Sequence, residues 1–244
     1  MALAGPTLLK AEGNETDGLT GTTGTFTPTA GAIIIATVAH GDAGGAGSNG
    51  GIADTFLGGI GAWTLLFDLL DGPNNSVRLT SWWALVGAGG TGTIVFTSGG
   101  SDNRWVWNVV EFTGANTSAP ISEDDSVTSL GSTTESIALA DIAAGNIAYG
   151  CVVGYGALGI DPGTNETELA SSEVVSGANS PVLTMQSESG TDNTVDWSSL
   201  SSSGNHHAIA MEIAAAAAAV SRVPIRERQY PRGVMRGVLR GAIR

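Results

Sequence analysis

The sequence predicts an all-β protein, a jelly-roll-like β-sandwich with two similar halves and an extended basic C-terminal arm. Charged residues are only 14% of the 244 residues, and 36 residues are glycine. Short apolar runs alternate with turn sequences such as DGPNNS at 71–76 and SGGSDN at 98–103. The hydrophobic content of 42% is enough to offset the chain entropy lost on folding. Many short strands between glycine-rich turns are typical of sandwiches and jelly rolls.

Six runs of strand length follow one another in the first part of the chain. They are residues 20–26, 32–40, 63–70, 76–85, 91–97 and 105–113. In the fourth run, Val77 and Leu79 flank Arg78, which indicates one buried and one exposed face. From such alternation we expect these side chains to be mostly buried: Ile33, Ile35, Val38, Leu79, Ile94, Phe96, Val110, Phe112, Val152, Ile209, Met211 and Ile213.

The order of strands and turns then returns, which we interpret as an internal duplication of about six strands each, 20–113 and 131–213. Gly31 aligns with Gly145, and the segment VVEFTG aligns with AMEIAA, so that Glu111 falls over Glu212. The first half carries a longer loop at 41–61, and 114–126 is interpreted as a crossover. We favour one compact sandwich over 1–213, with two tandem sandwiches as the alternative.

The C-terminal part of the chain differs from the rest in composition and charge. Residues 214–220 are alanine-rich and predict a hinge or a short helix. The segment 221–244 carries seven arginines and one glutamate, a net charge of +6. Residues 1–220 carry three basic and 22 acidic residues, a net charge of −19. The body therefore repels nucleic acid and anionic membranes, and only the arm attracts either.

The arm has a four-residue repeat of arginine, glycine and two apolar positions. In an extended chain its arginines lie on one side, while Met235, Leu239 and Ile243 lie on the other. We therefore predict a docking arm that uses arginines for an acidic partner and apolar residues for a groove. The predicted partner-binding residues are Arg222, Arg226, Arg228, Arg232, Met235, Arg236, Leu239, Arg240, Ile243 and Arg244. Contact of these arginines with nucleic-acid phosphates is an alternative that ranks lower, because the acidic body opposes it.

Motifs that could carry chemistry have simpler structural interpretations, so we expect no catalytic site, metal or cofactor. GAGSNG at 45–50 precedes no helical pattern and indicates a loop. His206 and His207 are adjacent, so in a strand they point to opposite faces. Glu111 and Glu212 are the one symmetric carboxylate pair suited to glycan cleavage, but each sits in an apolar strand, facing outward or a partner.

The remaining candidates point to packing or to solvated loops. Cys151 lies in an apolar run and is expected to be a small core residue. The six tryptophans are expected in cores or interfaces. The acidic segments 122–126 and 161–168 are interpreted as solvated loops. The N-terminal segment lacks the pattern of a signal peptide, and no segment has the roughly 20 apolar residues of a membrane span.

Four segments resemble the β-sandwich modules of structural proteins from tailed bacteriophages and prophages. They are GTFTPTAGAIIIATVAHGD, WTLLF, VRLTSWWALVGAGGTGTIVFT and WNVVEFTGANTSAP, within a resemblance that covers about residues 7–214. The resemblance implies a non-enzymatic virion protein, such as a capsid decoration, head-fibre or tail-associated protein. The implied partners are the major capsid protein or neighbouring subunits in a homo-oligomer, with a trimer as one option. It supplies no catalytic residues.

Two other functions stay open on the sequence alone. One is a carbohydrate- or receptor-binding module of a tail-associated protein, which an exposed tryptophan platform would favour. The other is a glycan-cleaving enzyme, which two close carboxylates in a cleft would favour.

Overall fold

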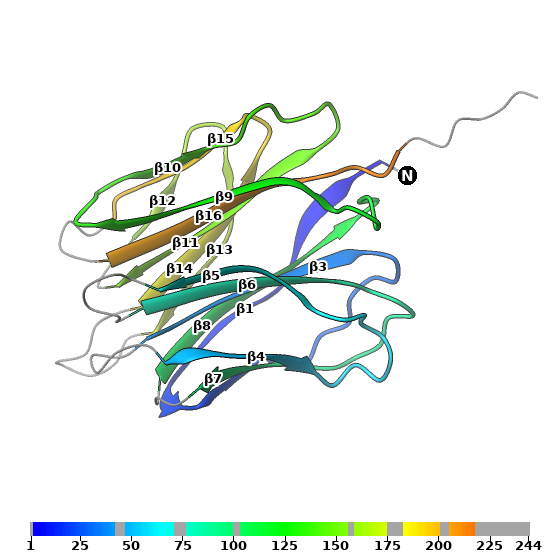
Figure 1. Ribbon diagram of the computed structural model, residues 1–244, viewed down its shortest axis with the longest axis horizontal. Helices are drawn as coiled ribbons and strands as arrows, with labels where there is room; N and C mark the ends of the chain where they lie inside the picture. The colour runs from blue at the N-terminus through cyan, green and yellow to red at the C-terminus, as the bar shows by residue number, and fades with distance from the viewer. Residues whose placement is uncertain are drawn as a thin grey trace, which may run out of the picture.

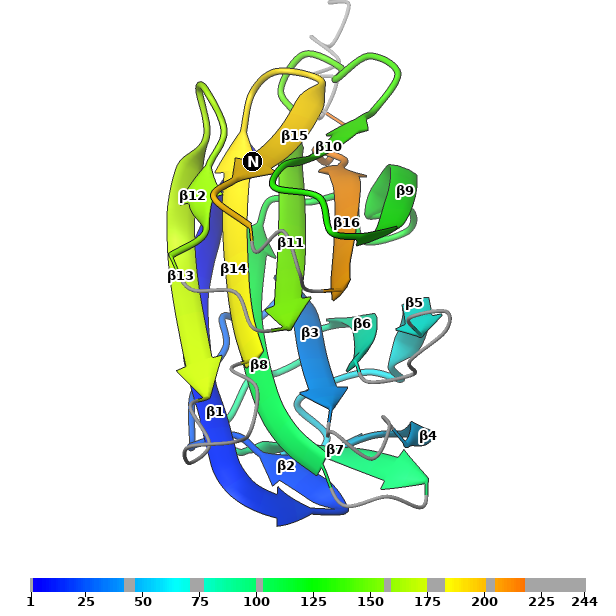
Figure 2. The same ribbon diagram turned by 90° about the vertical axis from the view of Figure 1, so that its left-hand side faces the viewer.

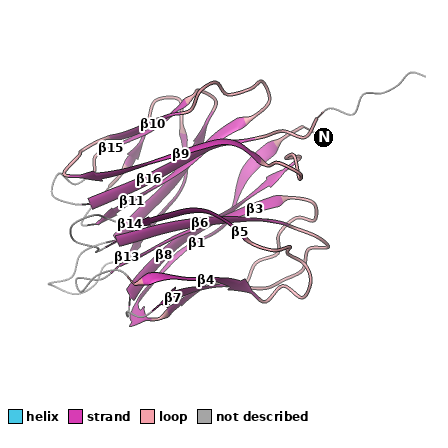
Figure 3. Cartoon of the chain, in the orientation of Figure 1, coloured by secondary structure: helices cyan, strands magenta, loops and turns pink. Residues whose placement is uncertain are grey.

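The computed structural model describes residues 2–41, 47–70, 77–99, 103–155, 159–174, 183–200 and 205–217, and within them every regular element is a β-strand (Figure 3). The first half contains β1 (Ala4–Gly18), β2 (Thr20–Thr22), β3 (Ile33–Gly41), β4 (Ser48–Asp54), β5 (Thr64–Leu70), β6 (Val77–Leu85), β7 (Ile94–Gly99) and β8 (Asn103–Thr113). The second half contains β9 (Ile121–Leu130), β10 (Glu135–Ala138), β11 (Ile147–Tyr155), β12 (Asp161–Pro162), β13 (Thr167–Val174), β14 (Leu183–Gly190), β15 (Thr194–Ser198) and β16 (Asn205–Ile213). The all-β prediction is confirmed.

The two halves have the same strand order. The first half forms an inner sheet in the order β1-β8-β3-β6-β5 and an outer sheet in the order β2-β7-β4. The second half forms an inner sheet in the order β9-β16-β11-β14-β13 and an outer sheet in the order β10-β15-β12. Counted from the start of each half, both read 1-8-3-6-5 and 2-7-4, a jelly-roll arrangement of antiparallel strands. Gly31 and Gly145 precede the equivalent strands β3 and β11 with positive φ angles of 79° and 91°.

The four sheets are stacked, with the two inner sheets in the middle (Figures 1 and 2). One core lies between the two inner sheets, and each half has a further core between its inner and outer sheet. Every residue of β3 and of β16 is buried, because these strands have a core on both faces. The twelve residues predicted to be buried are all at most 1% exposed, so that prediction is confirmed.

The inner sheets face each other with an approximate two-fold relation. β1 packs against β13, β8 packs against β13 and β14, and β6 contacts β16. In the second half, β13, β14 and β16 are the counterparts of β5, β6 and β8. Thus β8 contacts the counterpart of β6, and β6 contacts the counterpart of β8, as a two-fold relation requires. Asn108 of β8 crosses this interface: its amide donates to Ser187 Oγ at 3.1 Å and accepts from Ser172 Oγ at 3.0 Å.

Several edge strands differ from the sequence expectation. The acidic segment 161–168, expected to be a solvated loop, contains β12 and the first two residues of β13. The predicted loop at 41–61 contains β4, and the predicted crossover at 114–126 leads into β9, which includes the acidic segment expected to be a solvated loop. β1 was not expected at all, and each half has eight strands rather than about six. These are edge strands of their sheets, with one neighbour each and many polar residues. An edge strand needs no alternating apolar pattern, so its sequence resembles a loop.

Candidate docking surface

Glu111 and Glu212, the symmetric pair of glutamates, each hold a loop of their own half in place through hydrogen bonds. Glu111 is 6% exposed and accepts hydrogen bonds from the Thr29 N–H at 2.7 Å and the Thr29 hydroxyl at 2.8 Å. Glu212 is 5% exposed and accepts from the Ala143 N–H at 2.7 Å and the Asn146 amide at 2.8 Å. Each carboxylate thus holds the loop that precedes the third strand of its own half. The expectation that they face outward was wrong, and they do not form the close pair that glycan cleavage requires.

Hydrogen bonds also decide the ionisation of Glu212. Burial acts to raise the pKa of this carboxyl group, but bonds from the Ser122 hydroxyl, the Ala143 N–H and the Asn146 amide lower it further than burial raises it. Glu212 is therefore held as a carboxylate, which is what a tie to backbone N–H groups requires.

The two adjacent histidines face different layers, as predicted. His207 has Nδ1 at 2.9 Å from Thr128 Oγ1 and Nε2 at 3.3 Å from the carbonyl of Val77 in the other half. His206 has Nδ1 at 3.9 Å from Glu135 Oε1, and burial lowers the pKa of His206.

Ser129, Glu135 and His206 lie together in the second half but are not in the order of a catalytic triad. The Ser129 hydroxyl donates to Glu135, so the carboxylate stands between the hydroxyl and the imidazole. In a triad the imidazole stands between them and takes the proton of the nucleophile. In the part of the chain that the structure describes, no group of three His, Cys, Asp or Glu side chains is arranged to hold a metal ion.

The sequence did not predict that Glu188 and Glu166 meet, and Glu166, expected in a solvated loop, is half-buried. Glu188 of β14 is fully buried, and Glu166 accepts hydrogen bonds from the Gly163 N–H at 2.9 Å and the Asp196 N–H at 3.2 Å. Burial and the nearby Glu166 raise the pKa of Glu188 to about 10, and burial raises the pKa of Glu166 to about 7. Glu188 is thus uncharged at neutral pH. Its position in a polar strand, MQSESG, carries no signal that distinguishes it from a surface glutamate.

Tryptophans and the cysteine are packing residues, as predicted. Trp82, Trp105, Trp107 and Trp197 are at most 5% exposed, and the other two tryptophans are partly buried. None forms the exposed platform that sugar stacking would need. Cys151 is fully buried, and burial raises the pKa of its thiol to about 12, so it is not an activated nucleophile.

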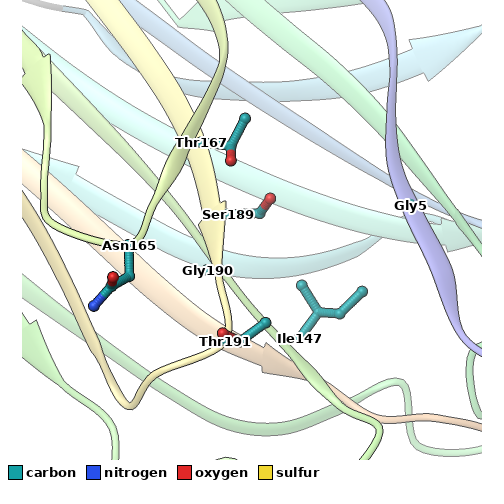
Figure 4. A pocket seen from close by; sticks show the side chains of 7 residues that line it. All are labelled: Gly5, Ile147, Asn165, Thr167, Ser189, Gly190 and Thr191. Atoms are coloured by element: carbon teal, nitrogen blue, oxygen red, sulfur yellow. The ribbon is translucent and has the colours of Figure 1, made fainter.

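A surface depression of about 200 Å³ lies where β1 meets the β13–β14 end of the second half (Figure 4). It is lined by Gly5, Ile147, Asn165, Thr167, Ser189, Gly190 and Thr191. None of these side chains titrates near neutral pH, so the depression offers hydrogen bonds but no acid or base for catalysis.

The chain beyond β16 leaves the body as an extended segment. The Ala214 N–H bonds the Pro120 carbonyl at 2.8 Å, the Asn116 N–H bonds the Ala214 carbonyl at 2.8 Å, and the Ala216 N–H bonds the Gly114 carbonyl at 2.9 Å. The described residues 214–217 are therefore extended rather than helical. The exit lies beside the start of β9.

β9 and β5 form one side of the molecule, which we call the β5/β9 side (Figure 2). Each is the edge strand of its inner sheet. Asp124 and Asp125 of β9 are exposed, and Leu130 at its other end is 63% exposed. On β5, Leu65 is 49% and Leu70 is 36% exposed. Edge strands with carboxylates and exposed leucines are candidates for docking an extended basic and apolar chain.

The predicted partner-binding residues themselves, all between 222 and 244, lie outside the described residues. The docking prediction for the arm therefore stays a prediction. In the part of the chain that is described, no helix has the length and apolar character needed to cross a membrane. No family model, curated protein or solved structure matches the chain.

Proposed function

We propose that the protein is a non-enzymatic structural component of a bacteriophage particle, displayed on the virion as a capsid decoration or head-fibre protein. In this proposal its basic arm anchors it to another virion protein. The observation that carries the anchoring role is the division of charge, −19 on residues 1–220 against +6 on 221–244. The virion role rests on the resemblance of the four segments quoted above to phage sandwich modules.

The position of the exit is consistent with an arm that works outside the body. Three backbone hydrogen bonds hold residues 214–216 against 114–120, so the chain leaves from a fixed point. Among the described residues, the members of the three cores all lie at or before residue 213. In this proposal the arm adds reach and charge to the body. The proposed partners are the major capsid protein or neighbouring subunits in a homo-oligomer.

Deletion of residues 218–244 tests the anchor. We expect the truncated chain to keep its β circular dichroism spectrum, because the described residues of all three cores are retained. We expect it to be lost from particles that are assembled with it in place of the full chain. The measurement is its occupancy in purified particles by quantitative mass spectrometry. A truncated chain that incorporates at the level of the full chain would overturn the proposal.

Substitutions within the arm separate charge from apolar contact. Replacing Arg232, Arg236 and Arg240 with Glu should weaken attachment most at low salt, where repulsion is least screened. Replacing Met235, Leu239 and Ile243 with Ser should weaken it with little dependence on salt. Binding that instead falls steeply with added salt and requires nucleic acid would favour the phosphate-contact alternative.

A further inference from the structure

The edge of β9 is open to another strand. β9 pairs with β16 on one side, and no described strand pairs with its other side. Its counterpart in the first half, β1, packs closely against β13. The equivalent partners on the other side, β5 and β9, make little contact with each other among the described residues. The two-fold relation between the halves is therefore closed on one side and open on the β5/β9 side.

Charge and apolar surface on β9 are arranged by strand register. Asp124 pairs with Met211 and faces the other half, whereas Asp125 pairs with Ala210 and faces the outer sheet. The Glu123 carboxylate is already used by the Ala140 N–H, at 2.8 and 2.9 Å. Leu130 pairs with Asn205 and lies on the same face as Asp124. The edge thus presents Asp125 on the face toward the outer sheet, where its carboxylate also accepts a hydrogen bond from the Ser126 N–H at 2.7 Å. Asp124 and Leu130 lie on the face toward the other half.

The face of β9 toward the other half also looks onto apolar residues of β5. Leu66 and Leu69 of β5 pack at the margin of the core between the halves and are only partly buried. An apolar strand face laid beside β9 would cover them, and would cover Leu130 as well. Burying such side chains is favourable by about 25 cal/mol per Å² of apolar surface.

The arm has the matching pattern. Its last 13 residues, from Arg232, are long enough to lie along the ten residues of β9. As a strand it places Arg232, Arg236 and Arg240 on one face and Met235, Leu239 and Ile243 on the other. Its +6 charge complements the acidic edge.

Resting on the proposed docking role of the arm, we propose that residues 221–244 of one copy add as a strand to the β9 edge of a second copy. The arginine face lies on the side of Asp125, which is therefore the carboxylate of β9 that meets the arginines. The apolar face lies on the side of Leu130 and β5, where Asp124 also lies. The second copy is the favoured acceptor because β16 runs antiparallel to β9, so the chain leaves past the Ile121 end and away from its own Asp124 and Asp125 (Figure 1). Such head-to-tail contacts form a ring if the rotation between copies closes, and an open filament if it does not.

Complementation of full-length variants tests the inference. One variant carries Arg232→Glu, Arg236→Glu and Arg240→Glu in the arm, and the other carries Asp125→Arg in β9. Self-association is measured by sedimentation velocity. We expect the unmodified chain to self-associate, and we expect the association of each variant alone to be weaker by about tenfold or more. A mixture of the two should associate more tightly than either alone, since one intact arm then meets one intact edge. All four changes in one chain should restore association.

The matched control places the same charge change on the opposite edge strand. Glu173→Arg changes an exposed residue of β13, whose side of the sheet is covered by β1. This control should associate like the unmodified chain. The inference is overturned if the control is weakened equally, if the β9 variant associates normally, or if the unmodified chain is a monomer with its arm on its own β9.

The same variants distinguish this inference from the proposed function. If the β9 variant enters particles normally while the arm variant does not, the arm anchors elsewhere and only the β9 inference fails. If the chain without residues 218–244 enters particles normally, the docking role of the arm fails, and with it both proposals.

Discussion

At the scale of single residues, position relative to the three cores decides the role of each side chain. Phe112 is fully buried between the halves, where its ring meets Tyr149 edge-on at a centroid distance of 5.7 Å. Glu188 is equally buried but polar, and it is accommodated by remaining protonated. The first residue stabilises the fold through packing, and the second makes its stability depend on pH.

Phe112→Ala should lower the free energy of unfolding by about 3–5 kcal/mol, because it removes a large ring from a close-packed core. Denaturant titration followed by tryptophan fluorescence measures this loss. Leu57→Ala is the control, since Leu57 is fully exposed, and it should change stability by no more than about 0.5 kcal/mol. An unchanged midpoint for Phe112→Ala would show that the inter-half core contributes little.

Glu188→Gln should make the protein more stable at about pH 8 and flatten its pH dependence. The pKa of Glu188 is raised from 4.5 to about 10, so the folded state binds a proton that the unfolded state releases. The associated stability is complete below about pH 4.5 and declines as the pH rises toward 10. Glutamine keeps the shape without titrating. Denaturant titrations from about pH 5 to pH 9 test this, and an unaltered slope relative to the unmodified chain would contradict it.

At the scale of elements, each half repeats the same tie between a strand and a loop. Glu111 on β8 holds the loop before β3, and Glu212 on β16 holds the loop before β11. The faint alignment of these residues in the sequence thus corresponds to a shared structural role rather than to a pair of catalytic groups. The repeat of strand order places them at equivalent positions.

Glu212→Gln should cost about 1–3 kcal/mol, because an amide cannot accept all the hydrogen bonds that the carboxylate accepts from Ser122, Ala143 and Asn146. The pKa of Glu212 is lowered in the folded state, so its contribution is present above about pH 4.5 and is lost as the pH falls through the lowered value. The difference between variant and unmodified chain should therefore shrink in acid. A constant difference at every pH would argue against a charge-assisted tie.

At the scale of the whole molecule, the two jelly rolls are one packed unit. The core between the inner sheets draws on both halves, and Asn108 adds buried hydrogen bonds across it. Because buried polar groups are costly when unpaired, this network favours a single relative placement of the halves. We expect the body to unfold in one cooperative transition.

Asn108→Ala should destabilise both halves together, by about 1–3 kcal/mol, since it leaves the buried hydroxyls of Ser172 and Ser187 with a lost partner. Hydrogen–deuterium exchange read by mass spectrometry on peptides from β3 and β11 measures the effect in each half. Faster exchange in one half alone would show that the jelly rolls open independently.

Local sequence pattern is enough to predict the fold class, the buried side of the central strands and the opposite facing of His206 and His207. These features depend on the alternation of neighbouring side chains, which is local and therefore legible in the chain. The twelve core residues and the burial of Cys151 follow from the same signal.

Which polar segments are strands, and which carboxyl groups meet, depends on contacts between distant parts of the chain. β1, β4 and β9 lie at sheet edges, where one pairing partner suffices and apolar alternation is not required. Glu188 and Glu166 meet through the pairing of β14 with β13 and the packing of the outer sheet above them. The stacking of four sheets, which buries β3 and β16 on both faces, joins segments a hundred residues apart. No local pattern records such contacts, because they depend on where the rest of the chain lies.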